Sequence, residues 1–268
     1  MNSLTVHGTE IWYADRGTEQ PVVLVHGFPL DHTMWAELID ALAGPATRIL
    51  APDLRGFGRS PLGTIGDAKF TMDQFADDLA AWLDALAIRE PVVFCGLSMG
   101  GYIAFQFCRK YAARLRGLIL CDTKATADTP EGAAARRDTA ERVLREGTAP
   151  LIEGMLPKLL AESTVRQRPE LVERLRRTIA AGNPQGIAAA ARGMAERPDM
   201  TAALGQIRCP TLVVVGQHDA ISPPAEMRRL AAAISGAKLA EIPAAGHMAP
   251  MENPVAVSGA TREFLAGI

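Results

Sequence analysis

The sequence has few cysteines and no excess of charge of either sign. Its cysteines show neither a CxxC pair nor the spacing of metal ligands: Cys95, Cys108, Cys121 and Cys209. That scatter argues against a disulfide-rich secreted scaffold and a structural zinc site, so we expect no metal. The 28 Lys and Arg residues are offset by 30 Asp and Glu residues, for a formal net charge of −2. Without a basic face, the chain is not expected to bind nucleic acid.

Long apolar stretches and targeting signals are also missing. No run reaches the roughly 18 apolar residues that suggest a membrane-spanning helix. Residues 1–4 lack the charged and apolar regions of a signal peptide. We therefore expect no membrane partner, and cysteines without a disulfide pattern favour a cytoplasmic protein. The apolar share of 48% and the charged share of 22% are those of a globular chain.

Short apolar runs recur along the chain and predict the strands of a sheet. Two of them, Leu4–Val6 and Ile11–Ala14, flank a turn and predict an antiparallel hairpin. The others are continuous, as in buried parallel strands, and lie at 21–26, 48–51, 91–95, 115–121, 211–215 and 238–242. Helical patterns alternate with them at 72–86, 99–111, 224–234 and 255–265. Thr71 and Gln74 form a capping-box pattern before the first of these helices. The alternation predicts an α/β fold with a mostly parallel sheet flanked by helices.

Residues 124–204 interrupt this alternation. The stretch is rich in Ala, Arg, Glu and Leu and contains no strand-like run. Short helices separated by prolines are expected at 141–145, 151–160, 171–179 and 185–194. We predict a helical cap at 124–204, inserted between two segments of the core at 1–123 and 205–268.

A GxSxG motif at residues 96–100 is the sharpest local signal for chemistry. An apolar strand ends directly before it and a helical run begins directly after it, which is the setting of a nucleophile elbow. Ser98 is therefore the predicted nucleophile, and it needs a base to remove its proton. Only His218 and His247 follow Ser98, as the chain order of this kind of triad requires. We expect His247 to be the base, because its loop follows the strand at 238–242 and active sites lie beyond strand ends.

Two aspartates compete for the role of triad acid. Asp219 and Asp122 each stand at the carboxyl end of an apolar strand. Asp219 is favoured because its strand directly precedes the one that leads to His247. The acid orients the imidazole and stabilises the imidazolium that forms.

An oxyanion site needs two backbone N–H donors. We expect them from Met99, directly after the nucleophile, and from Phe28, in the loop after the strand at 21–26. His26 is expected to be a buried, hydrogen-bonded anchor of that loop. In the cap, an apolar substrate pocket is predicted to be lined by Met155, Leu156 and Leu159, and Arg136 or Arg137 is a candidate partner for a substrate carboxylate.

Several motifs together resemble the α/β-hydrolase superfamily over nearly the whole chain. They are HGFP at 26–29, DLRGFGRS at 53–60, GLSMGG at 96–101, GQHD at 216–219 and GH at 246–247. Within the superfamily the chain is most similar to bacterial 3-oxoadipate enol-lactonases and small carboxylesterases. The resemblance implies an eight-stranded core sheet and a helical cap. It also implies cofactor- and metal-free acyl-enzyme hydrolysis of a small-molecule ester or lactone. Residues 53–60 would form a structural turn beside the active-site mouth.

The same motifs leave other functions open. A perhydrolase or haloperoxidase without a cofactor, or a carbon–carbon bond hydrolase, uses the same triad. A relative that binds a ligand without turning it over is the alternative from a different class. A dehalogenase is disfavoured, because it would need an aspartate where Ser98 stands.

Overall fold

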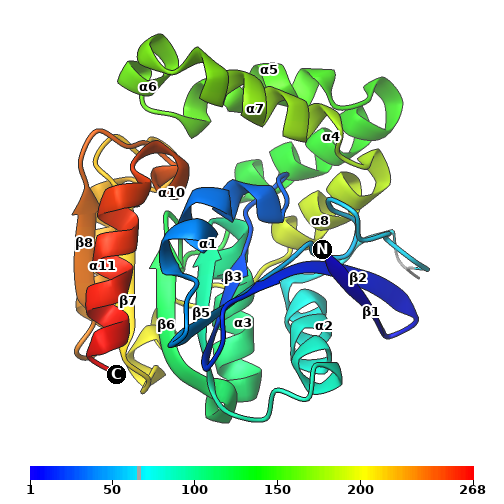
Figure 1. The fold of residues 1–268 in the computed structure, drawn as a ribbon. Helices are drawn as coiled ribbons and strands as arrows, with labels where there is room; N and C mark the ends of the chain where they lie inside the picture. Colours follow the sequence, from blue (N-terminus) through cyan, green and yellow to red (C-terminus); the bar gives the residue numbers. More distant parts are fainter. Residues whose placement is uncertain (65–67) are drawn as a thin grey trace.

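The computed structural model describes residues 1–64 and 68–268. Within them, eight strands form one sheet in the order β1-β2-β4-β3-β5-β6-β7-β8 (Figure 1). The strands are β1 (Asn2–Val6), β2 (Thr9–Arg16), β3 (Gln20–Val25), β4 (Thr47–Pro52), β5 (Val92–Leu97), β6 (Leu115–Cys121), β7 (Thr211–Gly216) and β8 (Lys238–Ile242). β2 runs antiparallel to β1 and β4, and all other neighbours are parallel. The prediction of a mostly parallel, eight-stranded sheet is confirmed.

α-Helices pack on the sheet, and two pairs of them also contact each other. Outside residues 124–204 they are α1 (Ala36–Leu42), α2 (Met72–Ala85), α3 (Met99–Tyr111), α9 (Pro224–Ala233), α10 (Ala249–Glu252) and α11 (Pro254–Ala266). α1 packs against α11, and α2 packs against α3. β5 and β7 are buried at every position, because strands inside a parallel sheet are covered on both faces. The predicted capping box is present at the start of α2, where Thr71 and Gln74 bond each other's backbone N–H.

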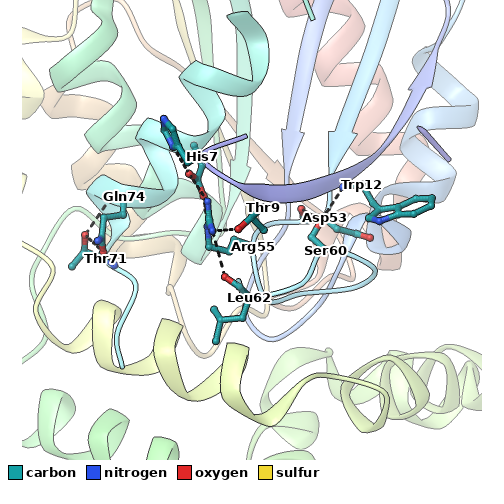
Figure 2. Close-up of polar contacts among 10 residues, drawn as sticks. His7, Thr9, Trp12, Asp53, Arg55, Ser60, Leu62, Thr71 and Gln74 are labelled. Carbon is teal, nitrogen blue, oxygen red and sulfur yellow. Dashed lines mark hydrogen bonds and ion pairs between the residues drawn. The ribbon is translucent and has the colours of Figure 1, made fainter. Parts of the chain in front are cut away.

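A buried polar network ties the N-terminal hairpin and the loop after β4 to α2 (Figure 2). Arg55 is buried, and its guanidinium donates to the carboxylate of Asp78 at 2.7 and 3.0 Å. The same guanidinium contacts the Thr9 hydroxyl and the Leu62 carbonyl, and His7 contacts Asp78 at 2.9 Å. A buried charge without a partner is strongly destabilising, so Arg55 must keep these partners. Its contacts therefore hold the loop after β4 against the N-terminal hairpin and against α2.

Hydrogen bonds of the Ser60 hydroxyl complete this loop. The amide of Trp12 on β2 donates to the Ser60 hydroxyl at 2.9 Å, and that hydroxyl donates to the Asp53 carbonyl at 2.8 Å (Figure 2). Residues 53–60 thus form a tightly bonded turn, as the resemblance implied.

The chain between β6 and β7 is helical. It contains α4 (Pro130–Glu146), α5 (Ala149–Leu159), α6 (Glu162–Gln167), α7 (Pro169–Ala180), α8 (Pro184–Ala195) and the 3₁₀ helix η3 (Thr201–Gln206). Figure 1 shows α5, α6 and α7 as a layer at the top of the molecule, above α1 and α10. α4 is much longer than the helix predicted at 141–145, because Thr129 caps it and Pro130 starts it. The division into core and cap at 123/124 and 204/205 stays a prediction. No helix of the described residues is long and apolar enough to cross a membrane.

Candidate active site

Ser98 stands on a sharp turn between β5 and α3. Its backbone angles, φ 53° and ψ −111°, lie outside the regions that residues with a side chain ordinarily adopt. Two hydrogen bonds hold this conformation: the Ser98 amide donates to the Cys121 carbonyl at 3.0 Å, and the Thr123 hydroxyl donates to the Ser98 carbonyl at 2.8 Å. Leu97 and Met99 are buried, whereas Ser98 is only half-buried. The strained turn therefore leaves this serine partly accessible at the carboxyl end of the sheet.

The turn depends on two glycines that allow backbone segments to touch. A Cβ atom on Gly100 would collide with the carbonyl oxygen of Val25, at the end of β3. A Cβ atom on Gly96 would collide with the carbonyl of Gly100 itself. The two glycines of the motif thus let α3 start directly beneath the nucleophile.

Gly100→Ala should destabilise the fold by about 3 kcal/mol, the upper end of what overpacking ordinarily costs. Gly154→Ala is the matched control, since that glycine lies in α5 with no atom near the added methyl group. It should be neutral or stabilise by up to about 1 kcal/mol, because alanine favours helix. Urea unfolding measures both, and equal midpoints for the two variants would contradict the close approach at Gly100.

His247 lies in the loop after β8 and contacts Asp219. Its Nδ1 is 2.9 Å from Oδ2 of Asp219, and both side chains are buried. The other carboxylate oxygen of Asp219 accepts from the amides of Ile221 and Ser222 at 2.7 and 2.9 Å. Burial acts to raise the pKa of Asp219, but the hydrogen bonds from His247 and the two amides outweigh it and lower that pKa. An ionised Asp219 assigns the Nδ1 proton to the histidine and leaves Nε2 free to accept a proton.

Asp122 lies beside Asp219 but has a different environment. It is fully buried, and its Oδ1 accepts from the Gly216 amide at 2.8 Å. Its Oδ2 accepts no hydrogen bond from the described residues. Burial, and then the charge of Asp219, raise the pKa of Asp122 well above its usual value. Both effects favour the protonated form of Asp122.

His26 anchors the loop that passes the nucleophile. The Leu54 amide donates to its Nε2 at 3.0 Å, so Nδ1 carries the proton and donates to the Gly27 carbonyl, also at 3.0 Å. Burial lowers the pKa of His26 and keeps the ring neutral. A Cβ atom on Gly27 would lie 3.5 Å from the Cβ of Ser98. The expectation of a buried anchoring histidine is confirmed, and the loop it holds runs along the elbow.

The two amides expected to bind an oxyanion belong to the residues that follow Gly27 and Ser98. Phe28 follows Gly27, and its N–H donates to no other residue in the described part of the chain. Met99 is the first residue of α3, where an N–H has no acceptor inside the helix. Their role in an oxyanion site stays a prediction.

Glu252 joins the histidine loop to the helical segment, and the sequence reasoning missed it. Its buried carboxylate accepts from the Gly246 amide at 2.7 Å, from the Ala161 amide at 2.8 Å and from the Thr164 hydroxyl at 2.6 Å. The signal in the sequence was slight: Glu252 is the sole acidic residue between 242 and 262. Its partners lie about 90 positions away, so no local pattern pointed to them.

The residues predicted for the substrate pocket lie in α5. Leu156 and Leu159 are buried and Met155 is half-buried. The Leu159 carbonyl accepts from the amide of Met248, next to His247, at 3.1 Å. α5 therefore ends against the histidine loop, while the role of the three side chains as pocket walls stays a prediction.

The two arginines considered for a substrate carboxylate lie on α4. Arg136 already pairs with Asp128, which removes support for a role with substrate. Arg137 lines a surface hollow with Glu141 and Arg192 among others, and nothing in the structure directs it to Ser98.

A second histidine–carboxylate pair, His32 and Asp53, lies beside the loop of His26, whose ring accepts from the amide of Leu54, next to Asp53. Asp53 is fully buried and accepts from the Nδ1 and the backbone amide of His32 at 2.6 and 2.9 Å. Burial acts to raise the pKa of Asp53 and to lower that of His32, but the hydrogen bond and the charge attraction between the two side chains outweigh burial. The pKa of Asp53 is lowered and that of His32 is raised. The pair therefore joins two charged groups over part of the pH range.

His32→Gln should lower thermal stability more in mild acid than in base. A raised folded-state pKa of His32 contributes stability that is fully present below the unfolded value of about 6.5 and is lost as pH rises through the folded value. A lowered pKa of Asp53 contributes stability above about pH 3.9 that is lost as pH falls. The deficit in Tm should thus be larger at about pH 5.5 than at about pH 9, by roughly 2–4 °C. His218→Gln, at an exposed histidine, is the control, and an equal deficit at both pH values would contradict the ion pair.

Comparison with known proteins agrees with this geometry. Residues 20–254 match the sequence profile of the α/β-hydrolase fold family, and the chain belongs to that family. Among solved structures, a malate-bound thermophilic esterase from Thermogutta terrifontis is 48% identical with a TM-score of 0.96, over 100% of this chain and 99% of the esterase. The enol-lactonase from Burkholderia xenovorans is 29% identical with a TM-score of 0.90, over 99% and 100%. Among curated proteins, 3-oxoadipate enol-lactonase 2 of Acinetobacter baylyi is 28% identical over 98% of this chain and 96% of that protein. The predicted resemblance to enol-lactonases and carboxylesterases is confirmed.

Proposed function

We propose that the protein is a serine hydrolase that cleaves a carboxylic ester or a lactone. One observation carries the proposal: a serine on a strained strand–helix turn shares the carboxyl edge of the sheet with a buried His247–Asp219 hydrogen bond. A weak nucleophile, a base and a group that orients the base are the parts that acyl transfer needs. The esterase and enol-lactonases among its relatives support this substrate class.

The reaction follows from the roles of these groups. His247 Nε2 takes the hydroxyl proton of Ser98 while Oγ attacks the carbonyl carbon, and the carbonyl electron pair moves onto oxygen. The amides of Phe28 and Met99 donate to that oxyanion, and Asp219 stabilises the imidazolium. When the carbon–oxygen bond of the ester breaks, His247 gives its proton to the alkoxide; in a lactone this alkoxide stays on the acyl chain. Water then attacks the acyl-enzyme carbonyl while His247 takes its proton. The bond between the acyl carbon and Oγ breaks, His247 returns a proton to Oγ, and the acid leaves. No redox cofactor or metal takes part in these steps.

Turnover and labelling together test the proposal. The wild-type protein is assayed with p-nitrophenyl acetate, butyrate and octanoate and with aliphatic lactones, then treated with a phosphonate ester. We expect hydrolysis, fastest on short acyl chains, and one phosphonyl group on Ser98 that abolishes it. Binding of these esters without turnover would favour a ligand-binding protein. Formation of peroxyacid from acetate and peroxide in place of ester hydrolysis would favour a perhydrolase.

A further inference from the structure

The loop that carries His247 is held by hydrogen bonds on both sides of the histidine. The Gly246 amide, directly before it, donates to Oε1 of Glu252 at 2.7 Å. The Met248 amide, directly after it, donates to the Leu159 carbonyl at the end of α5 at 3.1 Å. These two contacts therefore fix the backbone on which the imidazole stands.

The second carboxylate oxygen of Glu252 faces the helical segment between β6 and β7. Oε2 accepts from the Ala161 amide at 2.8 Å and from the Thr164 hydroxyl at 2.6 Å. Both of these residues lie at the start of α6. The backbone carbonyl of Glu252 also accepts from the guanidinium of Arg168 at 3.0 Å. The carboxylate thus forms a bridge, with one oxygen on the histidine loop and the other on the helical segment.

The histidine loop has close contacts with the core as well as with the helical segment. A Cβ atom on Gly246 would lie 2.6 Å from the nitrogen of Ala161, so the two backbones are in direct contact. On the core side, the His218 amide donates to the Ala245 carbonyl at 2.8 Å. The base of the candidate triad is therefore carried by a loop that lies between two parts of the fold.

We propose that Glu252 is a positioning residue that couples the docking of the helical segment to the placement of His247, an inference that rests on the proposed hydrolase function. Its carboxylate is buried and already bonds three protein donors, so its effect passes through the Gly246 amide and not through contact with substrate. The bond to Asp219 holds only Nδ1 of the imidazole, and the position of Nε2 also depends on the backbone of the loop. A displacement of about 1 Å at a reacting group can cost about 10²-fold in rate.

Glu252→Gln tests the bridge with little change in size. The amide has a single oxygen, so its NH₂ faces either the Gly246 amide or the Ala161 amide, and one of these N–H groups loses its acceptor. We expect kcat for p-nitrophenyl butyrate to fall by about 10²-fold. KM should stay within about threefold, because the carboxylate does not contact substrate.

Thr164→Val is a milder test of the same bridge. It removes one of the three donors and keeps the shape of the side chain, so kcat should fall by about three- to tenfold at an unchanged KM. Thr178→Val is its matched control in the same helical segment, since among the described residues the Thr178 hydroxyl bonds only the Arg174 carbonyl, at 3.1 Å. The control should keep kcat within about twofold of the wild type.

Glu37→Gln is the matched control for Glu252→Gln. Glu37 in α1 pairs with Arg174 in α7, so it also joins the helical segment to the core. None of its hydrogen bonds among the described residues reaches the histidine loop. We expect kcat to stay within about twofold of the wild type, whereas an equal loss in both variants would mean that any loosening of the segment suffices and would overturn the role of Glu252.

Amide hydrogen exchange reports on the loop without turnover. In Glu252→Gln the amides of residues 245–248 should exchange about tenfold faster than in the wild type, and in Glu37→Gln they should not change. Unchanged exchange, or a kcat within about twofold of the wild type, would overturn the proposal. If Glu252→Gln showed no cooperative thermal transition, Thr164→Val would decide by the same two measurements. A wild-type protein without esterase activity would contradict the proposed function, while exchange would still decide whether Glu252 holds the loop.

Discussion

Ser98→Ala should lower kcat for p-nitrophenyl butyrate by about 10⁵–10⁶-fold, because the acyl group then has no acceptor on the protein. The fold should survive the change. The Ser98 side chain caps nothing in α3, and the turn is held through its backbone by Cys121 and Thr123. Alanine keeps the Cβ atom and therefore the same backbone preference. Steady-state kinetics together with a thermal melt measure both parts, and we expect a Tm within about 2 °C of the wild type.

A matched serine separates loss of the nucleophile from loss of packing. Ser258 in α11 is buried, and among the described residues its hydroxyl bonds only the carbonyl of Val255, at 3.1 Å. Ser258→Ala should keep activity within about twofold of the wild type. If Ser98→Ala retained even about one hundredth of the wild-type kcat, direct attack by water or another nucleophile would have to replace the acyl-enzyme scheme.

The sequence revealed most directly the parts of the site that are built from neighbouring residues, although strand order also led to Asp219 and His247, which lie 28 positions apart and are in contact. The GxSxG motif is visible because its steric conditions fall within one strand–turn–helix unit, and Gly96 and Gly100 meet them. The capping box of α2 is equally local. Alternating apolar runs were enough to predict the eight strands and the helices α2, α3, α9 and α11, because buried strands and helix faces are apolar in sequence. The short helices α1, α6 and α10 were not predicted.

The parts that the sequence did not reveal depend on contacts between distant segments. Glu252 bonds Ala161 and Thr164 across the fold, and neither end of that contact has a recognisable pattern. Apolar spacing predicted helices in 124–204 but not that α5 would end against the histidine loop. The raised pKa of Asp122 follows from burial beside Asp219, whereas the sequence showed only two aspartates in equivalent positions.

Asp219→Asn should lower kcat by about 10⁴-fold, the size expected when a triad carboxylate becomes an amide. An amide that donates to His247 Nδ1 would force the proton onto Nε2, where it cannot accept the proton of Ser98. The neutral amide also removes the charge that stabilises the imidazolium. Because substrate binding does not use this side chain, KM should change by less than about threefold. Kinetics on p-nitrophenyl butyrate above and below KM separate the two constants.

Asp122→Asn should instead keep kcat within about threefold of the wild type, although the two aspartates adjoin each other. Burial and the charge of Asp219 favour the protonated form of Asp122, so the amide replaces a group of similar shape whose favoured form is uncharged. Its oxygen can still accept from the Gly216 amide. Asp122→Ala removes this oxygen and should destabilise the fold by about 1–3 kcal/mol, because the buried Gly216 amide loses its acceptor. If Asp122→Asn lost as much activity as Asp219→Asn, a charged Asp122 would be part of the catalytic acid, and the assignment of the triad to Asp219 alone would be wrong.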